Sequence, residues 1–363
     1  MGWSLGALWQ PSVPAMLGVD IGASSVKLVE LGGGRRDAPT LLRYAIEPLA
    51  SGVVDEAGIQ QPDALVLALQ RALRRSEATA EPVALALPAA AVITRRIVLP
   101  AGLDEEDYEV QVEAEANQYV PFPIDEVDLD FMVLGPAERA GEIDVLIAAS
   151  RRDKVQERLQ IALRAGLKPV VMDVVPFAAR AALARVARRG PGAASGQILA
   201  LIDLGQAITA VSFVLDGQTV FERQQDFGGA TLTTRIAQRY GLTLEEAAQR
   251  QRTQELPDGW REALLAPFVG EAVVEIGRAL QFFMTSTAYS RVDKVYLAGG
   301  GATLPGMVEA LAQGLGQDVE PFSPFDGMTI APQVSRAALS RDACVLGVAC
   351  GLALRRFDSE RAL

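Results

Sequence analysis

Residues 15–31 read AMLGVDIGASSVKLVEL, and residues 199–214 read LALIDLGQAITAVSFV. Each stretch is an apolar strand that ends on an aspartate, has a glycine two residues later, and continues into a second strand of alternating character. The aspartates are Asp20 and Asp203, and the glycines are Gly22 and Gly205. The same β-hairpin therefore occurs twice, which predicts two similar α/β domains whose hairpin turns face one cleft.

The first turn has the composition of a phosphate-binding loop. Its residues are Gly22, Ala23, Ser24 and Ser25. They can direct successive backbone N–H groups and two hydroxyls at an anion, and Lys27 adds a compact positive charge. Asp20 and Asp203 are expected to hold Mg²⁺ mostly through its water molecules, because this ion dehydrates reluctantly. A single Asp-x-Gly turn is equally compatible with an ordinary hairpin.

A third element lies at residues 293–306, which read DKVYLAGGGATLPG. A buried strand runs into Gly299, Gly300 and Gly301 and then into a helix start, with Thr303 as its expected cap and Pro305 at an early helical position. Glycines this dense leave bare backbone against which a base and ribose can lie. A tight strand-to-helix turn would look the same. The spacing fits neither a Rossmann fingerprint nor a Walker loop.

Composition excludes several classes of function. The 363 residues include no histidine, which removes Ser-His-Asp and Cys-His catalysis and every histidine metal site. A net charge of −11 disfavours a nucleic-acid partner, because that binding needs Lys and Arg to displace counterions. Cys344 and Cys350 are six residues apart in an expected helix, so they do not share a face and are interpreted as reduced core thiols.

The chain is expected to stay in the cytoplasm. Its first positive side chain is Lys27, whereas a secretory signal needs a charged start. The most apolar stretches, residues 83–94 and 170–179, are too short and too interrupted to span a membrane. The segment from Trp3 to Trp9 is compatible with a membrane or partner contact and with a frayed tail.

The order of the three elements resembles the actin, Hsp70 and sugar-kinase superfamily. Within it, the chain resembles the PilM family of type IV pilus assembly proteins, with FtsA as a relative, from residue 17 to residue 354. The stretches that carry the resemblance are GVDIGASSVKLVEL, EAEANQYVPFPIDEVDLDFMVL, DVLIAASRRDKVQERLQIALRAGL, VPFAARAAL, GGATLTTRIAQRYGL and YLAGGGATLPG. The resemblance implies an actin-like two-lobed α/β fold, made of duplicated ribonuclease-H-like domains, with an inserted FtsA-type 1C subdomain.

This likeness divides the chain into four subdomains. The expected bounds are 15–95, 175–190 and 342–363 for 1A, 96–174 for 1C, 197–227 and 291–341 for 2A, and 228–290 for 2B. Helices at 176–188 and 343–356 are expected to cross between the lobes. Within 1C we expect strands at 96–99, 127–134, 143–149 and 169–174, a helix at 151–165, and an acidic helix that Asp104 caps. The carboxylates of that acidic helix complement its dipole and are interpreted as a solvated face rather than a catalytic pair.

The resemblance also implies a scaffold with ATP and Mg²⁺ in the central cleft and no catalytic residue. The residues implied for the nucleotide are Asp20, Gly22, Ala23, Ser24, Ser25, Lys27, Asp203, Gly205, Gln206, Gly228, Gly229, Gly299, Gly300 and Gly301, with Asp20 and Asp203 at the metal. The implied partner is the cytoplasmic tail of the platform protein PilN, held in a groove between 1A and 1C that residues 95–100 and 127–134 border. Peripheral association with the cytoplasmic face of the inner membrane and a contact with the pilus motor ATPase are implied as well.

One departure stands out from the family pattern. Relatives carry Ala-Glu-x-x-Lys in a helix that touches the ribose and base, whereas this chain reads AAQRQ at residues 247–251. Both charged contacts are missing, although Arg250 or Arg252 offers a substitute. An FtsA-like filament protein would be expected to end in a linker and a membrane helix, and a small-molecule kinase would need a carboxylate base with polar substrate contacts. Neither pattern is found.

Overall fold

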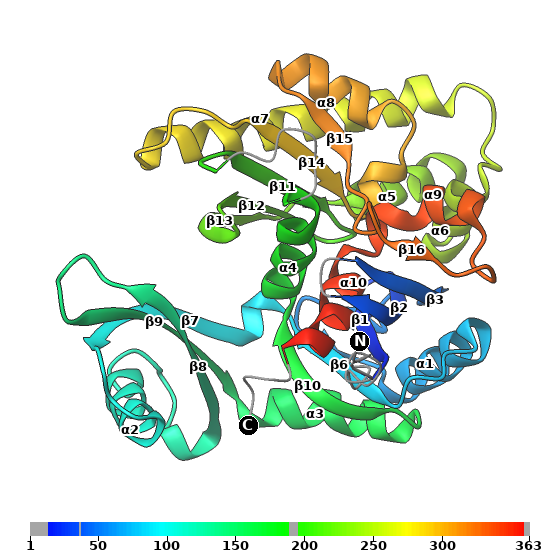
Figure 1. The fold of residues 1–363 in the computed structure, drawn as a ribbon. Helices are drawn as coiled ribbons and strands as arrows, with labels where there is room; N and C mark the ends of the chain where they lie inside the picture. Colours follow the sequence, from blue (N-terminus) through cyan, green and yellow to red (C-terminus); the bar gives the residue numbers. More distant parts are fainter. Residues whose placement is uncertain (1–13, 36–37, 189–194, 359–363) are drawn as a thin grey trace, which may run out of the picture.

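The computed structural model describes residues 14–35, 38–188 and 195–358. They form two α/β lobes, and a smaller three-stranded sheet projects from the first lobe (Figure 1). The first lobe contains β1 (Met16–Ile21), β2 (Ser25–Arg35), β3 (Ala38–Pro48), β4 (Val54–Asp55), β5 (Gly58–Ile59), α1 (Pro62–Ser76), β6 (Pro82–Leu87), α3 (Arg152–Arg164) and β10 (Lys168–Val174). The second contains β11 (Ile198–Leu204), β12 (Thr209–Leu215), β13 (Gln218–Gln225), α5 (Gly229–Tyr240), α6 (Leu244–Thr253), η4 (Arg261–Leu265), α7 (Ala266–Ser286), β14 (Lys294–Ala298), η5 (Gly300–Thr303), α8 (Met307–Leu315) and β15 (Val319–Pro321).

The two large sheets share one topology. In the first lobe the strand order is β10-β6-β1-β2-β3-β16, and in the second it is β13-β12-β11-β14-β15. In each, the first hairpin strand pairs in parallel with a later strand and antiparallel with its own partner, as β1 does with β6 and β2, and β11 with β14 and β12. The duplicated hairpin and the actin-like arrangement expected from the sequence are therefore confirmed.

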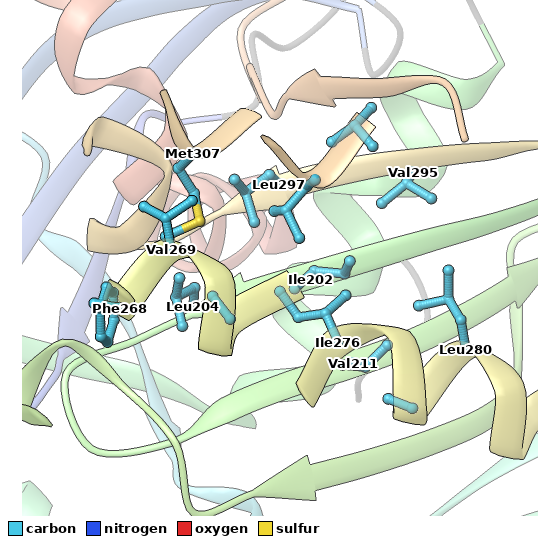
Figure 2. Packing of buried hydrophobic residues seen from close by; sticks show 14 of the residues in the cluster. Ile202, Leu204, Val211, Phe268, Val269, Ile276, Leu280, Val295, Leu297 and Met307 are labelled. Carbon is cyan, nitrogen blue, oxygen red and sulfur yellow. The ribbon is translucent and has the colours of Figure 1, made fainter. Parts of the chain in front are cut away.

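Each lobe has its own apolar core. In the second lobe, Ile202 and Leu204 of β11 pack with Ile276 of α7 and Met307 of α8, and Figure 2 shows these side chains interleaved between sheet and helices. In the first lobe, Leu17 and Val19 of β1 pack with Leu65 of α1. Because the sheets are covered by helices, the strands are apolar on most of their length.

Helix α4 and a later return segment join the lobes. α4 (Val175–Ala187) follows β10 and packs with Ala178 on the first lobe and with Leu183 on the second. The return segment contains β16 (Thr329–Ile330), α9 (Arg336–Asp342), η6 (Ala343–Val345), α10 (Gly347–Ala353) and η7 (Leu354–Phe357). The expected helix at 343–356 is therefore broken into three pieces. Cys344 and Cys350 are buried and not bonded to each other, and burial raises their thiol pKa to about 11 and about 12.

The projecting sheet is the insert. It contains η2 (Ala89–Ala91), β7 (Val92–Pro100), α2 (Glu105–Ala116), η3 (Ile124–Glu126), β8 (Val127–Pro136) and β9 (Glu142–Arg151), with the strand order β7-β9-β8. α2 covers one face through Val112, which packs on Val145 and Ile147 of the central strand. The carboxylate of Asp104 accepts a 2.9 Å hydrogen bond from the backbone N–H of Asp107, so the expected helix cap is confirmed.

Two of the expected subdomain boundaries need correction. Residues 152–174 were assigned to the insert, but β10 pairs with β6 in the first lobe's sheet, and Ile161 of α3 lies in the same core as Val19. Residues 329–330 were assigned to the second lobe, but β16 pairs with β3 of the first. Both errors arise because strand pairing between distant segments leaves no local signal in the sequence.

Within the described ranges, no single helix has the length and apolar character needed to cross a membrane, and one bent pair, Arg336–Val345 with Gly347–Phe357, meets those two criteria. The segment from Trp3 to Trp9 lies outside the described residues.

Candidate functional site

The first hairpin holds its charged residues in register. Asp20 pairs with Lys27 across β1 and β2, and the lysine Nζ lies 2.9 Å from Oδ2 of Asp20. The turn closes through a 3.1 Å hydrogen bond that the N–H of Gly22 donates to the carbonyl of Ser25. Asp20 is 7% exposed, whereas Ser24 is exposed at the tip of the turn. The hairpin therefore presents a paired lysine and carboxylate beneath a turn of small residues that include Ala23.

The second hairpin is fixed from outside by the start of α5. The N–H of Gly205 bonds to the carbonyl of Ile208 at 3.0 Å and closes the turn. The carbonyls of Gly205 and Gln206 accept hydrogen bonds from the N–H groups of Gly229 and Ala230, at 2.9 and 2.8 Å. The first N–H groups of this helix therefore hold the turn in place.

Close packing explains why the residue before that helix is a glycine. A Cβ on Gly228 would overlap the backbone of Gln206 and Ala207. Gly228 and Gly229, which the family resemblance implied as nucleotide contacts, thus lie directly against the second hairpin turn.

The three consecutive glycines have different surroundings. Gly299 has a φ of +83°, and a Cβ there would overlap the Oδ1 atom of Asp203. A Cβ on Gly301 would overlap the side chain of Leu204, whereas one on Gly300 would meet nothing within 4 Å. Gly299 and Gly301 therefore allow this turn to pack against the end of β11, and Gly300 faces open space.

The helix after this turn begins later than expected. α8 starts at Met307 with Gly306 as its N-cap residue, so the interpretation of Thr303 as the cap was wrong. The Thr303 hydroxyl instead donates a 2.7 Å hydrogen bond to the carbonyl of Gly300 within η5. The extra turn of η5 was not visible in the sequence, because a 3-10 turn and a helix start have similar composition.

Electrostatics ties the two hairpins together. Burial raises the pKa of Asp203 to about 6, the positive charge of Lys27 opposes this rise, and the negative charge of Asp20 adds to it. The charged side chains of the two hairpins are therefore close enough to influence one another. Two carboxylates and an ammonium group are the donor set that a hydrated Mg²⁺ and a phosphate chain require. No cluster of three or more Cys, Asp or Glu residues that could hold a metal occurs among the described residues, so water and phosphate would complete such a coordination shell.

The helix that departs from the family pattern is α6, and its neutral residue Gln251 forms a hydrogen bond within the second lobe. Gln251 of α6 accepts a 3.1 Å hydrogen bond from the hydroxyl of Thr233 on α5, and that hydroxyl also lies 3.1 Å from the carbonyl of Gly229. Ala247 is buried, whereas Arg250 and Arg252 are exposed. The position of the missing lysine is thus part of the network that supports the second hairpin.

The insert has one covered face and one open face. Val98 of β7 is 51% exposed and Met132 of β8 is 43% exposed, both on the face away from α2, where Arg96 and Asp144 form an ion pair. β9 lies between β7 and β8 in the sheet, so the two segments expected to border a groove are separated by Leu146 and its neighbours. An extended peptide could pair with the free edge of one of them or lie across the open face, but not pair with both.

One charged residue near the site was missed by sequence reasoning. Arg158 of α3 is 6% exposed, and burial lowers its pKa while the charges of Glu157 and Asp20 raise it. The available signal was its spacing, because residues 158, 161, 162 and 165 recur on one helical face and all four are buried. An arginine on such a face would have indicated a cation beneath the first lobe's sheet.

Comparison with known proteins places these features in a family. A family model described as type IV pilus assembly protein PilM matches residues 18–357. A solved structure described as the PilM-PilN type IV pilus biogenesis complex is 31% identical, covers 94% of this chain and 98% of that chain, and superposes with a TM-score of 0.78. The ethanolamine utilization protein EutJ from Carboxydothermus hydrogenoformans is 16% identical over 95% of this chain and 90% of that one, with a TM-score of 0.55, and shares the fold.

Proposed function

The chain belongs to the PilM family of type IV pilus assembly proteins, and from this premise we propose that it is an ATP-binding scaffold that carries the cytoplasmic tail of a PilN-type platform protein on its insert. The solved relative at 31% identity is a complex of PilM with PilN. A sequence this similar over nearly the whole chain supports the same kind of partner. Association with the inner membrane would then occur through that partner.

The observation that carries this proposal is the open face of the insert. Val98 and Met132 expose apolar side chains beside the ion pair of Arg96 and Asp144. Apolar anchors next to a fixed polar pair are what an extended peptide needs, because pockets for alternate side chains give specificity and main-chain hydrogen bonds on a strand edge give affinity. The face is continuous with the segments at residues 95–100 and 127–134 named from the sequence.

Nucleotide binding is supported by the charged side chains of the two hairpins, which influence one another. Lys27 with the turn at residues 22–25 would hold phosphate oxygens, and Asp20 and Asp203 would hold the waters of Mg²⁺. A bound nucleotide would supply phosphate charge for Lys27 to attract, and Asp20 and Asp203 would hold the waters of its Mg²⁺. Gly300, which faces open space, is the position of the glycine turn best suited to touch the base or ribose.

We propose that ATP acts as a structural ligand with slow or no hydrolysis. Fast phosphoryl transfer to water needs a group that positions the attacking water in addition to phosphate clamps. Among the described residues, the two hairpins carry Lys27, Asp20, Asp203 and Gln206 beside small turn residues, and we assign none of them that role. The family is one of assembly proteins, which agrees with this reading.

The experiment that tests the partner site measures binding of a PilN-type cytoplasmic tail peptide to the purified chain by calorimetry. Val98→Asp and Met132→Asp should each weaken binding at least tenfold, because a charge at a buried anchor is costly to desolvate. Val110→Asp is the matched control, since Val110 is 67% exposed on α2, which covers the opposite face. Equal loss for Val110→Asp, or full binding by both face variants, would place the peptide elsewhere.

A further inference from the structure

A polar pair fixes the return segment to the first lobe. The hydroxyl of Tyr44 on β3 donates a 2.9 Å hydrogen bond to Oδ2 of Asp342, the last residue of α9. The same strand pairs with β16, and its Leu42 carbonyl accepts a 3.0 Å hydrogen bond from the side chain of Gln333. The contact of Tyr44 therefore anchors the segment directly before η6 begins at Ala343.

The turn η6 then links the two lobes. The carbonyl of Cys344 accepts a 2.9 Å hydrogen bond from the N–H of Gly299, the first glycine of the turn after β14. On either side of Cys344, Ala343 and Leu346 are buried in the first lobe's core, which also contains Leu41 of β3. A peptide group held by the first lobe therefore accepts a hydrogen bond from the second.

Gly299 is packed too tightly to move independently of its neighbours. A Cβ at this position would lie 2.3 Å from Oδ1 of Asp203 and 2.5 Å from the carbonyl oxygen of Leu204. In a close-packed region, a shift of one backbone segment moves the atoms that lie against it. The placement of η6 therefore affects the position of the glycine turn next to Asp203.

The hydrogen bond of Tyr44 supplies a direction that apolar packing does not. Ala343 and Leu346 hold η6 near the first lobe, but the hydrophobic effect is non-directional. A hydrogen bond depends on distance and angle, so the pair of Tyr44 and Asp342 sets the orientation at which η6 begins. Burial and the bond to Asp342 raise the pKa of Tyr44 well above its usual value, so the hydroxyl stays a donor at neutral pH.

Both partners are within reach of water. Tyr44 and Asp342 are half-buried and line a surface pocket that also contains Ser76 and Ser335. Water can therefore replace the hydrogen bond when one partner is removed, and no charge is left buried without a partner. We expect the loss of the bond to shift η6 without unfolding the chain.

We propose that Tyr44 and Asp342 are positioning residues for the nucleotide site. Through η6 they hold the turn that starts at Gly299 at a fixed distance from the phosphate turn at residues 22–25. This inference rests on the proposed ATP site, in which one ligand contacts both turns. The turns belong to different lobes, so a ligand that bridges them binds best when their separation is set beforehand. A loosely held turn lowers the fraction of binding-competent protein and raises Kd in proportion.

The test measures Mg-ATP affinity by calorimetry and backbone amide exchange of the ligand-free full chain, at a temperature well below the melting of every variant. Tyr44→Phe keeps the ring and removes the donor, and Asp342→Asn keeps an acceptor oxygen. Tyr289→Phe is the matched control, because Tyr289 is also half-buried but stacks on Phe283 within the second lobe.

We expect Tyr44→Phe to lose roughly fivefold to thirtyfold in Mg-ATP affinity, the range that one hydrogen bond produces. The amide of Gly299 should exchange faster in this variant, because its acceptor on Cys344 is held less firmly. The amide of Gly22, which closes the first hairpin turn, should exchange at the wild-type rate. A role confined to general stability would not single out Gly299.

The outcomes separate this inference from the site on which it rests. Asp342→Asn should bind Mg-ATP more tightly than Tyr44→Phe, and a chain with both substitutions should bind no more weakly than Tyr44→Phe alone, because the two residues act as one pair. Tyr44→Phe that keeps Mg-ATP affinity within twofold of wild type, or an unchanged exchange rate at Gly299, overturns the positioning role and leaves the ATP site standing. An equal loss of affinity in Tyr289→Phe also overturns that role. A wild-type chain that binds no Mg-ATP overturns both.

Discussion

Lys27 and Asp20 stand opposite each other across the β1–β2 hairpin, and the lysine Nζ lies 2.9 Å from the carboxylate. This pair links the two functions expected of the turn. In the proposed site, the lysine would contact a phosphate and the carboxylate would contact the waters of a metal. The two side chains pair with each other, and both are mostly buried. Removing one would therefore leave the other buried without this partner.

Replacing Lys27 with Ala is expected to weaken Mg-ATP binding and also to destabilise the free protein. The first effect comes from lost phosphate attraction, and the second from leaving Asp20 buried and unpaired, at a cost of about 1–3 kcal/mol. The double variant Lys27→Ala with Asp20→Asn should recover most of the stability and none of the binding. Thermal melting with and without Mg-ATP measures both, since a ligand at a hundred times its dissociation constant stabilises by about 2.7 kcal/mol. Wild-type protein freed of nucleotide that shows no melting shift in millimolar Mg-ATP would refute the site.

The titration of Asp203 predicts a pH dependence in metal-free protein. Its pKa is raised to about 6 in the fold, chiefly by burial, whereas an unfolded aspartate titrates near 3.9. Between these values the folded state binds the proton more tightly, so the contribution of this group to stability decreases as pH rises from about 4 to 6. Asp203→Asn should therefore stabilise the protein at pH 7 to 8, by at most about 3 kcal/mol, and have little effect near pH 4.

Urea unfolding at several pH values in the presence of a chelator measures this effect. Asp258→Asn is the matched control, because Asp258 is exposed in the loop before Trp260. A stability difference between Asp203→Asn and wild type that does not change with pH would contradict the prediction. The same variant should bind Mg-ATP more weakly than wild type, since it lacks the carboxylate that holds the metal's waters.

Alanine substitutions at the neighbouring glycines Gly300 and Gly301 should distinguish a role in packing from a role in nucleotide binding. Gly301→Ala should destabilise the protein by about 1–3 kcal/mol, because the new methyl group overlaps Leu204 in a close-packed core. Gly300→Ala should leave stability within about 0.5 kcal/mol of wild type, because nothing lies within 4 Å of its Cβ. If the nucleotide rests on this turn, Gly300→Ala reduces Mg-ATP affinity. Unchanged affinity would remove Gly300 from the site.

The insert should be removable without loss of the nucleotide site. It enters and leaves the first lobe at one point, because Val92 pairs with Ser150 and the Ser150 hydroxyl lies 2.8 Å from the carbonyl of Ala91. A chain in which a short Gly/Ser linker replaces residues 92–151 keeps α3 and β10, and it should still melt cooperatively and bind Mg-ATP. It should bind no PilN-type peptide. Peptide binding at wild-type affinity would show that the partner site lies outside the insert.

Hydrolysis is expected to be slow. Without a residue assigned to position the attacking water, turnover should remain well below the order of one per second typical of kinases. Phosphate release under multiple-turnover conditions measures it, and Asp20→Asn serves as the background control. A rate of one per second or faster that Asp20→Asn abolishes would identify an active ATPase and contradict the scaffold reading.

The sequence alone determined the features that depend on near neighbours. Alternating strands that end in Asp20 and Asp203, with Gly22 and Gly205 at the turns, specify two hairpins, because strand alternation and turn chemistry act over a few residues. The cap of α2 by Asp104 is equally local. The family and its two-lobed fold were implied by the resemblance of several longer stretches to PilM proteins, and the comparisons confirm both.

Only the tertiary structure decided which distant segments share a sheet, a core or a site. Lys168 pairs with Pro82, so β10 and α3 belong to the first lobe and not to the insert. Gly301 packs against Leu204, and Arg158 of α3 is buried, because segments far apart in the chain come together around these residues. Such contacts are specified by the complementarity of whole surfaces, which no short stretch of sequence contains.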